Sequence, residues 1–417
     1  MSCATAASRR RGVAASTRME SVWATEMRAC IARGDVRGVR ECMKYEQAAE
    51  RDVGQDAVRM GVFEALWDAV RHGRVRILRE LARHGVDLDM VDPMTGWTLV
   101  MLAAKFDQKD CLDELLRHRP LLDVKNDKGQ TALHLAAKWG RKECLQLLLE
   151  HGAAIECADR YGRSAVVLAL EKQHESCFRL LIEHVASVEM RDQAGKTLLA
   201  LAAESDQKTF VQILLERGAD LDARDRQGRT PLMNAGLWGS TECVKILMEH
   251  GADLEERTTS SGHTALLEAV PEGRDPCLRL LKLGASAWAT DSTGRTALHM
   301  LLSYDLSAAS MRDASDLIQL FTQYGLSADF VDSRGETPMH LAVTAWRSSA
   351  HMAQLLLSFL VRCGANINTG AEQFGCPTPL MVFARAHPES AEEFILNHRA
   401  RISHDHMRRL FQDVLQV

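Results

Sequence analysis

Histidines and cysteines are the residues of this sequence that most readily suggest catalysis or metal binding. His134, His299 and His340 recur in similar surroundings, and His404 and His406 flank Asp405. A zinc site needs three or four protein ligands at defined spacings, and no further ligand lies near residues 404–406 at such a spacing. No phosphate-binding, dinucleotide-binding, serine-hydrolase or kinase motif is present. We therefore expect neither an enzyme nor a bound cofactor, and an enzyme or metalloprotein is the remote alternative.

The positions of the cysteines argue against disulfides and metal ligation. Five of the eleven stand fifteen residues after a recurring glycine, namely Cys111, Cys144, Cys177, Cys243 and Cys277. This equivalence predicts core residues that behave as small hydrophobes. Stacked helices lie about 8–10 Å apart, beyond the roughly 7 Å Cα limit for a disulfide. Buried reduced thiols are typical of intracellular proteins, so we expect a cytoplasmic, or alternatively nuclear, protein.

The glycines that set this spacing form a repeat of 33 residues. They stand at Gly96, Gly129, Gly162, Gly195 and Gly228, and Gly262, Gly294 and Gly335 continue the series at intervals of 34, 32 and 41. An Asp usually precedes each glycine by three residues, and Thr or Ser follows by two. Glycine permits the positive φ of a tight turn, Asp accepts hydrogen bonds from the turn backbone, and the hydroxyl caps a helix. Such a period indicates a solenoid whose units pack only on their neighbours.

Each unit is predicted to hold two helices, as in residues 126–153. The Ala-rich segment LHLAAKWG is followed by ECLQLLLEHG, whose apolar residues have helical spacing. TALHLAA at 131–137 and TPMHLAV at 337–343 resemble the T-P-L-H-x-A signature of the ankyrin repeat family. The resemblance implies an all-α solenoid of about ten or eleven helix-turn-helix units with hairpin tips. It also implies that His134, His299 and His340 form structural hydrogen bonds between adjacent turns.

The chain is divided into four expected segments. Residues 1–20 are rich in Arg and Ala and predict a disordered tail, with a presequence or a nuclear signal at Arg9–Arg11 left open. Residues 21–91 resemble two degenerate terminal repeats, and 92–402 form the array. Its units lengthen after Gly294, where residues 303–316 suggest a longer inter-helix loop. Val185 replaces a helix-ending glycine and predicts another backbone path. Residues 403–417 would form a capping helix or tail.

Composition and resemblance together indicate a protein that binds other proteins. The net charge of −5 gives no reason to expect a nucleic-acid or membrane partner, and the apolar runs are too short to span a bilayer. We expect a monomeric, non-catalytic scaffold or adaptor whose turn tips and first helices form a concave groove. The alternative is a substrate-recruiting adaptor of a ubiquitin ligase, although residues 403–417 are short for a recruiting box and no F-box is visible.

Two sets of residues are candidates for the binding surface. Aromatic residues stand ten positions after the turn glycine, at the expected end of the first helix: Phe106, Trp139, Trp238 and Tyr304. Basic residues stand on the turns: Arg160, Arg163, Lys196, Arg226, Arg229 and Arg295. Aromatic and Arg residues dominate interface hot spots, which suggests an acidic or extended segment as partner. The alternative is that the tryptophans only pack over the next repeat. We expect the turn bases to be exposed, so reversing Arg163, Lys196 or Arg229 should hardly change stability.

Overall fold

The computed structural model describes residues 26–53, 55–185, 187–303, 311–345, 350–369, 377–398 and 402. These residues form helices and no strand, with isolated bridges at Val91–Thr98, Arg191–Thr197 and Thr290–Thr296 beside the turns. The chain separates into two compact units, residues 1–188 and 189–417. The predicted all-α repeat fold is confirmed.

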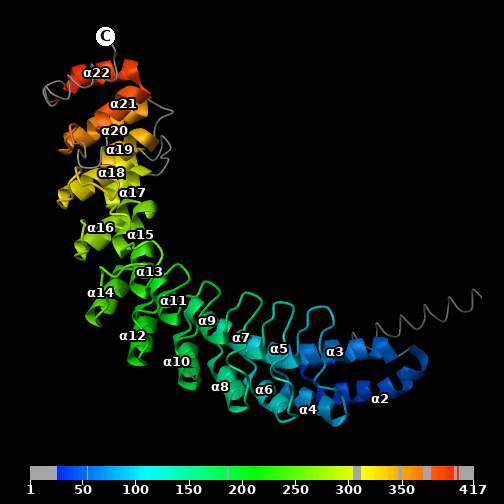
Figure 1. Cartoon of the computed structure of the whole chain (residues 1–417). Helices are drawn as coiled ribbons and strands as arrows, with labels where there is room; N and C mark the ends of the chain where they lie inside the picture. Colours follow the sequence, from blue (N-terminus) through cyan, green and yellow to red (C-terminus); the bar gives the residue numbers. More distant parts are fainter. Residues whose placement is uncertain are drawn as a thin grey trace, which may run out of the picture. The chain divides into compact units, whose positions relative to one another are not determined.

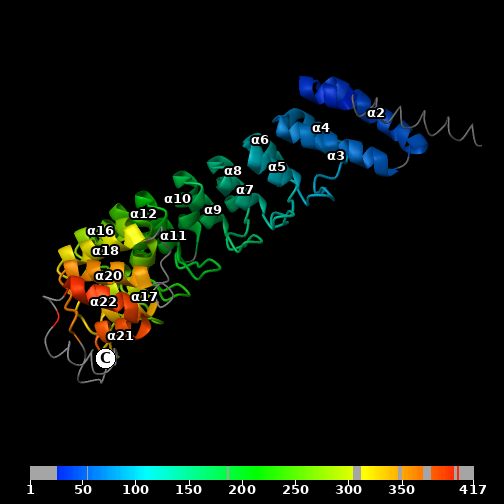
Figure 2. The same cartoon turned by 90° about the horizontal axis from the view of Figure 1, so that it is seen from above.

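In the first unit, helices alternate between two rows. The first row holds α3, α5, α7 and α9, and the second holds α4, α6, α8 and α10 (Figure 1). The loops before α5, α7 and α9 project from the first row on the side away from the second, as Figure 2 also shows. The bounds, after a helical stretch at 26–33, are α2 (Val36–Val53), α3 (Gln55–Arg71), α4 (Val75–Arg83), α5 (Leu99–Phe106), α6 (Lys109–Leu116), α7 (Ala132–Lys138), α8 (Lys142–Glu150), α9 (Ala165–Glu171) and α10 (Glu175–His184).

The second unit follows the same alternation of first and second helices. Consecutive first helices pack on one another from α11 to α13 and from α13 to α15, and each also packs on the second helix of its own repeat. The bounds are α11 (Leu198–Glu204), α12 (Lys208–Glu216), α13 (Pro231–Trp238), α14 (Thr241–Glu249), α15 (Ala265–Ala269) continued by the 3-10 turn η1 (Val270–Glu272), α16 (Arg274–Lys282), α17 (Ala297–Ser303), α18 (Met311–Gln323), α19 (Pro338–Ala345), α20 (Ala350–Arg362), α21 (Pro379–Ala386) and α22 (Pro388–His398).

The first helices are kept short by signals at both ends. The hydroxyl of Thr98 accepts a hydrogen bond from the N–H of Met101 at 3.2 Å and begins α5. Left-handed residues reverse the chain after these helices, with φ of 60° at Asp107, 69° at Gly140 and 74° at Gly239. Helices of two turns are marginal in isolation. Their stability therefore depends on packing against the neighbouring repeats.

The cysteines predicted for the core lie there. Cys111, Cys144, Cys177, Cys243 and Cys277 are fully buried, and every cysteine among the described residues is free. Burial raises the pKa of Cys111, Cys144, Cys243 and Cys277 to about 12 and that of Cys177 to about 11. The prediction of buried, reduced thiols is confirmed for these five positions.

The histidines connect adjacent turns, as predicted. Nδ1 of His134 accepts hydrogen bonds from the N–H of Thr131 at 3.2 Å and from its hydroxyl at 2.8 Å. Nε2 then donates to the carbonyl oxygen of Arg163 in the next turn, at 3.1 Å. His299 and His340 make the same contacts, with Nε2 distances of 3.0 and 2.7 Å to the next carbonyl. Each imidazole thus satisfies a helix N-terminus and a carbonyl of the following repeat.

A row of basic side chains, which the sequence analysis did not identify, makes a second set of contacts between turns. Nη1 of Arg224 donates to the carbonyl oxygen of Gly228 at 3.0 Å and to that of Arg257 in the next repeat at 2.6 Å. Arg191 and Arg257 repeat this arrangement in the second unit. In the first unit, Nζ of Lys125 donates to a carbonyl 33 residues later, at 2.9 Å. The slot four or five residues before the turn glycine therefore fixes the spacing of the turns.

Two predicted departures from the regular repeat can be compared with the structure. Val185 is extended, with φ −77° and ψ 144°, so the different path predicted there is confirmed. The predicted long loop over 303–316 is wrong for its second half, because α18 begins at Met311 and its buried Ala314 joins the core. Residues 304–310, the predicted tail 1–20 and the predicted cap 403–417 lie outside the described residues.

Two glycines allow the cost of backbone strain to be measured separately from the cost of crowding between adjacent turns. Gly129 and Gly152 both have positive φ, so Ala at either position costs about 1–2 kcal/mol. A Cβ at Gly129 would lie 2.8 Å from the backbone nitrogen of Arg160, whereas a Cβ at Gly152 would meet nothing within 4 Å. We expect Gly129→Ala to cost at least about 1 kcal/mol more than Gly152→Ala. Hydrogen exchange should show lost protection at both turns 126–130 and 159–163, and equal effects of the two changes would contradict contact between the turns.

The histidines make stability sensitive to pH. Burial lowers the pKa of His134, His299 and His340 below the ordinary value of about 6.5. Below about pH 6.5 the unfolded chain binds protons that the folded chain does not, so the free energy of unfolding falls as pH falls. Urea unfolding at about pH 7.5 and about pH 5.5 should show a smaller pH effect in His134→Gln than in the wild type. His151→Gln, at an exposed position, is the control. An unchanged pH effect in His134→Gln would contradict this account.

Candidate protein-binding surface

The predicted surface residues lie at the ends of the first helices and on the turns beside them, within each unit. The first unit holds Phe106, Trp139, Arg160 and Arg163, and the second holds Lys196, Arg226, Arg229, Trp238 and Arg295. Tyr304 lies outside the described residues.

The aromatic positions differ in how far they are exposed. Trp139 directly follows α7 and is 45% exposed, while Trp238 ends α13 and is 67% exposed. Phe106, at the same repeat position, is half-buried. The cationic groups of Arg71 and Lys105 lie over its ring, with Arg71 Cζ and Lys105 Nζ at 5.6 and 5.1 Å from the centroid. A large aromatic side chain left in water forgoes roughly 2 kcal/mol of burial. Among the described members of this set, the two tryptophans are therefore the aromatic side chains that remain open to a partner.

In the first unit, the basic residue that directly follows the turn glycine forms ion pairs within its own repeat. Guanidinium nitrogens of Arg163 lie 2.9 Å from Asp159 and 3.0 Å from Glu171. Burial alone would raise the pKa of Asp159, but hydrogen bonds from the backbone and side chain of Arg163 outweigh it and hold this pKa below its ordinary value. Arg163 therefore stabilises its turn and offers little free charge.

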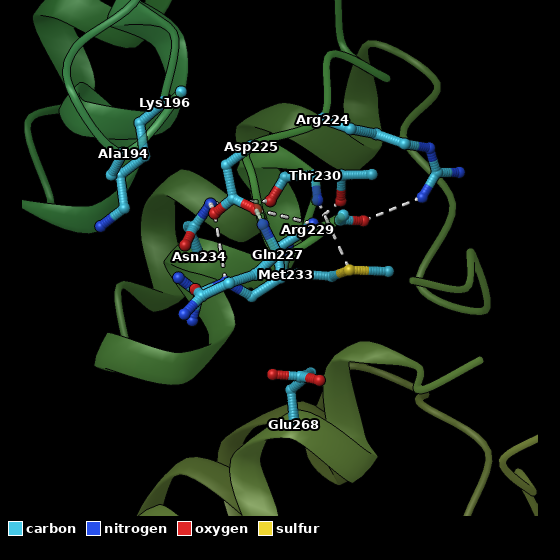
Figure 3. Close-up of polar contacts among 12 residues, drawn as sticks. Ala194, Lys196, Arg224, Asp225, Gln227, Arg229, Thr230, Met233, Asn234 and Glu268 are labelled. Carbon is cyan, nitrogen blue, oxygen red and sulfur yellow. Dashed lines mark hydrogen bonds and ion pairs between the residues drawn. The ribbon is translucent and has the colours of Figure 1, made fainter. Parts of the chain in front are cut away.

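The same slot is paired in the second unit. Lys196 pairs with Glu204, Arg229 with Asp225 at 3.2 Å, and Arg295 with Asp332 at 3.5 Å. Asp225 also accepts the backbone N–H of Gln227 and of Arg229, and the side-chain amide of the buried Asn234 donates to it at 3.3 Å (Figure 3). The side chains of Arg163, Lys196 and Arg229 are only 27%, 16% and 17% exposed. The expectation that Arg163, Lys196 and Arg229 are exposed is wrong, because each folds onto a carboxylate of its own repeat. Arg295 instead pairs with a carboxylate of the next repeat.

The base two residues before the glycine behaves differently. Arg160 and Arg226 are exposed, and neither side chain joins an ion pair among the described residues. Of the bases predicted for the surface, these two arginines carry the charge that a partner could reach. Each lies in a different unit.

Comparison with known proteins places the chain in a family. The family model described as ankyrin repeats (3 copies) matches residues 66–159, 154–225 and 222–291, which together make up more than half of the chain. The chain belongs to the ankyrin repeat family. Ankyrin repeats are in general protein-protein interaction modules, which agrees with the predicted class of function.

Other comparisons add little to this assignment. The crystal structure of the human ASB11 ankyrin repeat domain is 26% identical, with a TM-score of 0.46, and the match covers 52% of this chain and 96% of that one. No curated protein matches the sequence. No group of three or more metal-ligating side chains occurs among the described residues, and no helix in that part of the chain is both long and apolar enough to cross a membrane.

An aromatic cluster at the beginning of the ankyrin array escaped the sequence analysis. The rings of Phe63 and Trp67 on α3 are 5.4 Å apart, and that of Trp97 lies 6.3 Å from Trp67. Nζ of Lys105 is 5.0 Å from the centroid of Trp97. One signal was available, because Trp97 occupies the slot after the turn glycine that Arg163 fills in a later repeat. Trp67 precedes the first turn glycine and could not be aligned in this way.

Changes at Arg229 and Arg226, which stand on one turn, test whether the pairing of Arg229 with the buried Asp225 stabilises the fold. Arg229→Glu would place a second carboxylate beside the buried Asp225, so we expect the free energy of unfolding to fall by about 1–3 kcal/mol. The matched change Arg226→Glu, at an exposed position, should alter it by no more than about 0.5 kcal/mol. Chemical denaturation of both variants is the measurement. Equal, small effects would mean that Arg229 is a solvated charge after all.

Proposed function

We propose that this chain is a non-catalytic scaffold or adaptor that binds another protein through the ends of its first helices and the adjacent turns. The observation that carries the proposal is the exposure of Trp139 and Trp238. They occupy the same repeat position, one in each unit, and are 45% and 67% exposed.

The degree of exposure favours binding over internal packing. A tryptophan that served only to pack over the next repeat would be buried there, as Leu133 and Leu232 of the same helices are. Tryptophan is the residue type most enriched in hot spots, where it fills a desolvated pocket of the partner. Short helices fixed by contacts with both neighbours would lose little conformational entropy on binding, which favours affinity.

The exposed arginines support the further proposal of an acidic or extended partner segment. Arg160 and Arg226 each stand two residues before a turn glycine, in the unit that also holds Trp139 or Trp238 respectively. A carboxylate of the partner could pair with either guanidinium without breaking an existing ion pair. We propose a monomer that holds one such partner, and the contribution of these arginines should weaken as salt rises.

Photo-cross-linking tests which face is used. A photoreactive phenylalanine analogue placed at Trp139 or Trp238 should cross-link one and the same protein in cells. The analogue at Gln146 on α8 or Lys245 on α14, both exposed on second helices, serves as the matched control. Cross-links from the control positions and none from the tryptophan positions would contradict the proposal.

The partner identified in this way allows a quantitative test. Trp139→Ala and Trp238→Ala should each weaken its binding by about 2 kcal/mol or more, the scale of a hot spot. Because Trp139 and Trp238 are 45% and 67% exposed, their truncation should lower the melting temperature much less than that of a fully buried aromatic, which would cost about 3–5 kcal/mol. Tyr324→Ala, at an exposed aromatic residue that follows α18, is the control. Unchanged affinity in both tryptophan variants, or a large loss of stability, would refute the role as anchors.

A further inference from the structure

A pocket in the first unit lies outside the surface that the sequence predicted. Its volume is about 410 Å³, and it is lined by Arg28, Phe63, Glu64, Trp67, Asp68 and Asp92. These residues come from the helical stretch 26–33, from α3 and from the turn before α5. The volume is within the range of about 300–1,000 Å³ that is usual for ligand pockets.

Aromatic rings form one part of the pocket. Phe63 is almost fully buried and anchors the cluster, and its ring is inclined by 48° to that of Trp67. Trp97, which lies next to the pocket, is inclined by 60° to Trp67. In these two pairs the rings are tilted rather than stacked face to face. Trp67 is half-buried and can take a further group.

The charges that line the pocket are mainly negative. Three carboxylates, those of Glu64, Asp68 and Asp92, face a single guanidinium. Arg28 pairs with Glu64, and its Nε lies 3.8 Å from Oδ2 of Asp68. The carboxylate of Asp92 accepts the N–H of Met94 at 3.2 Å and the hydroxyl of Thr95, and it joins no ion pair among the described residues. With three carboxylates and one guanidinium, the lining of the pocket carries an excess of negative charge.

We propose that this pocket binds an arginine side chain of a partner protein, an inference that rests on the proposed function and adds the chemistry of one contact. A guanidinium stacks on an indole face and also pairs with carboxylates through its planar fork. The chain's own cations already make both kinds of contact in this cluster. Arg28 pairs with Glu64, and Nζ of Lys105 lies over Trp97. The partner's arginine enters beside Arg28, over Trp67, and pairs with Asp68 and Asp92.

The N-terminal part of this chain is the competing occupant. Arg9, Arg10 and Arg11 precede the described residues, and the helical stretch that contributes Arg28 begins at residue 26. If these arginines filled the pocket, a partner would find it occupied. The experiment therefore includes a full-length variant in which all three are changed to Ala.

Binding of a fluorescein-labelled Gly-Arg-Gly-Arg-Gly peptide to the full-length protein, followed by fluorescence anisotropy, tests the proposal. We expect Asp68→Asn with Asp92→Asn to weaken binding roughly tenfold or more, and wild-type binding to weaken as salt rises. Glu143→Gln with Glu175→Gln removes the same number of carboxylates, at exposed positions of α8 and α10 in the same unit, and should have no effect. A peptide with Gln in place of Arg should not bind. Circular dichroism confirms that each variant is folded.

Three results would overturn the proposal. They are equal affinity of the wild type and the Asp68→Asn, Asp92→Asn variant, equal affinity for the Gln peptide, and binding that appears only in the variant lacking Arg9–Arg11. The last result would assign the pocket to the chain's own N-terminal segment. Trp67→Leu should abolish binding that Trp67→Phe retains in part. Trp139→Ala should leave peptide binding unchanged, so a failure here is distinguishable from a failure of the proposed function.

Discussion

The structure depends on the hydrogen bonds by which each repeat completes the backbone of the next. A first helix such as α7 has seven residues and cannot satisfy its own ends. His134 joins the start of α7 to a carbonyl of the following turn, and Arg224 joins carbonyls of two successive turns in the second unit. Polar groups buried between repeats would otherwise be left without partners, at a cost of about 1–3 kcal/mol each. Regular spacing of the turns is the direct consequence.

The same requirement decides which side chains are available for binding. Arg163 and Arg229, two of the basic residues predicted to meet an acidic partner, pair instead with Asp159 and Asp225 of their own turns. Among the described candidate residues a smaller set is left exposed, which consists of Trp139, Trp238, Arg160 and Arg226. In the proposed complex the tryptophans would supply the apolar contacts and the arginines the charge. Specificity in such a protein resides in the few positions that the repeat does not need for its own stability.

Repeat position made much of the fold predictable from the sequence. Burial of Cys144 followed from a slot that recurs along the repeats, because equivalent positions have equivalent surroundings. The hydrogen bonds of His134 were implied by the resemblance to the ankyrin signature. The burial of the turn bases could not be predicted, since it depends on whether a carboxylate lies within reach, and that carboxylate is Asp225 for Arg229 but Glu204 for Lys196. The pocket at Trp67 was also missed, because α3 precedes the first turn glycine and lacks the motif that would align it. The binding role of Trp139 and Trp238 is a prediction that the family assignment leaves open.

The most direct test of the central claim is hydroxyl-radical footprinting of the protein, free and in complex with its cross-linked partner. Oxidation of each aromatic side chain, read by mass spectrometry, reports its exposure in both states. We expect Trp139 and Trp238 to be reactive in the free protein and protected in the complex, while Tyr324 after α18 reacts equally in both. Protection of Tyr324 and of second-helix residues, with both tryptophans still reactive, would contradict it.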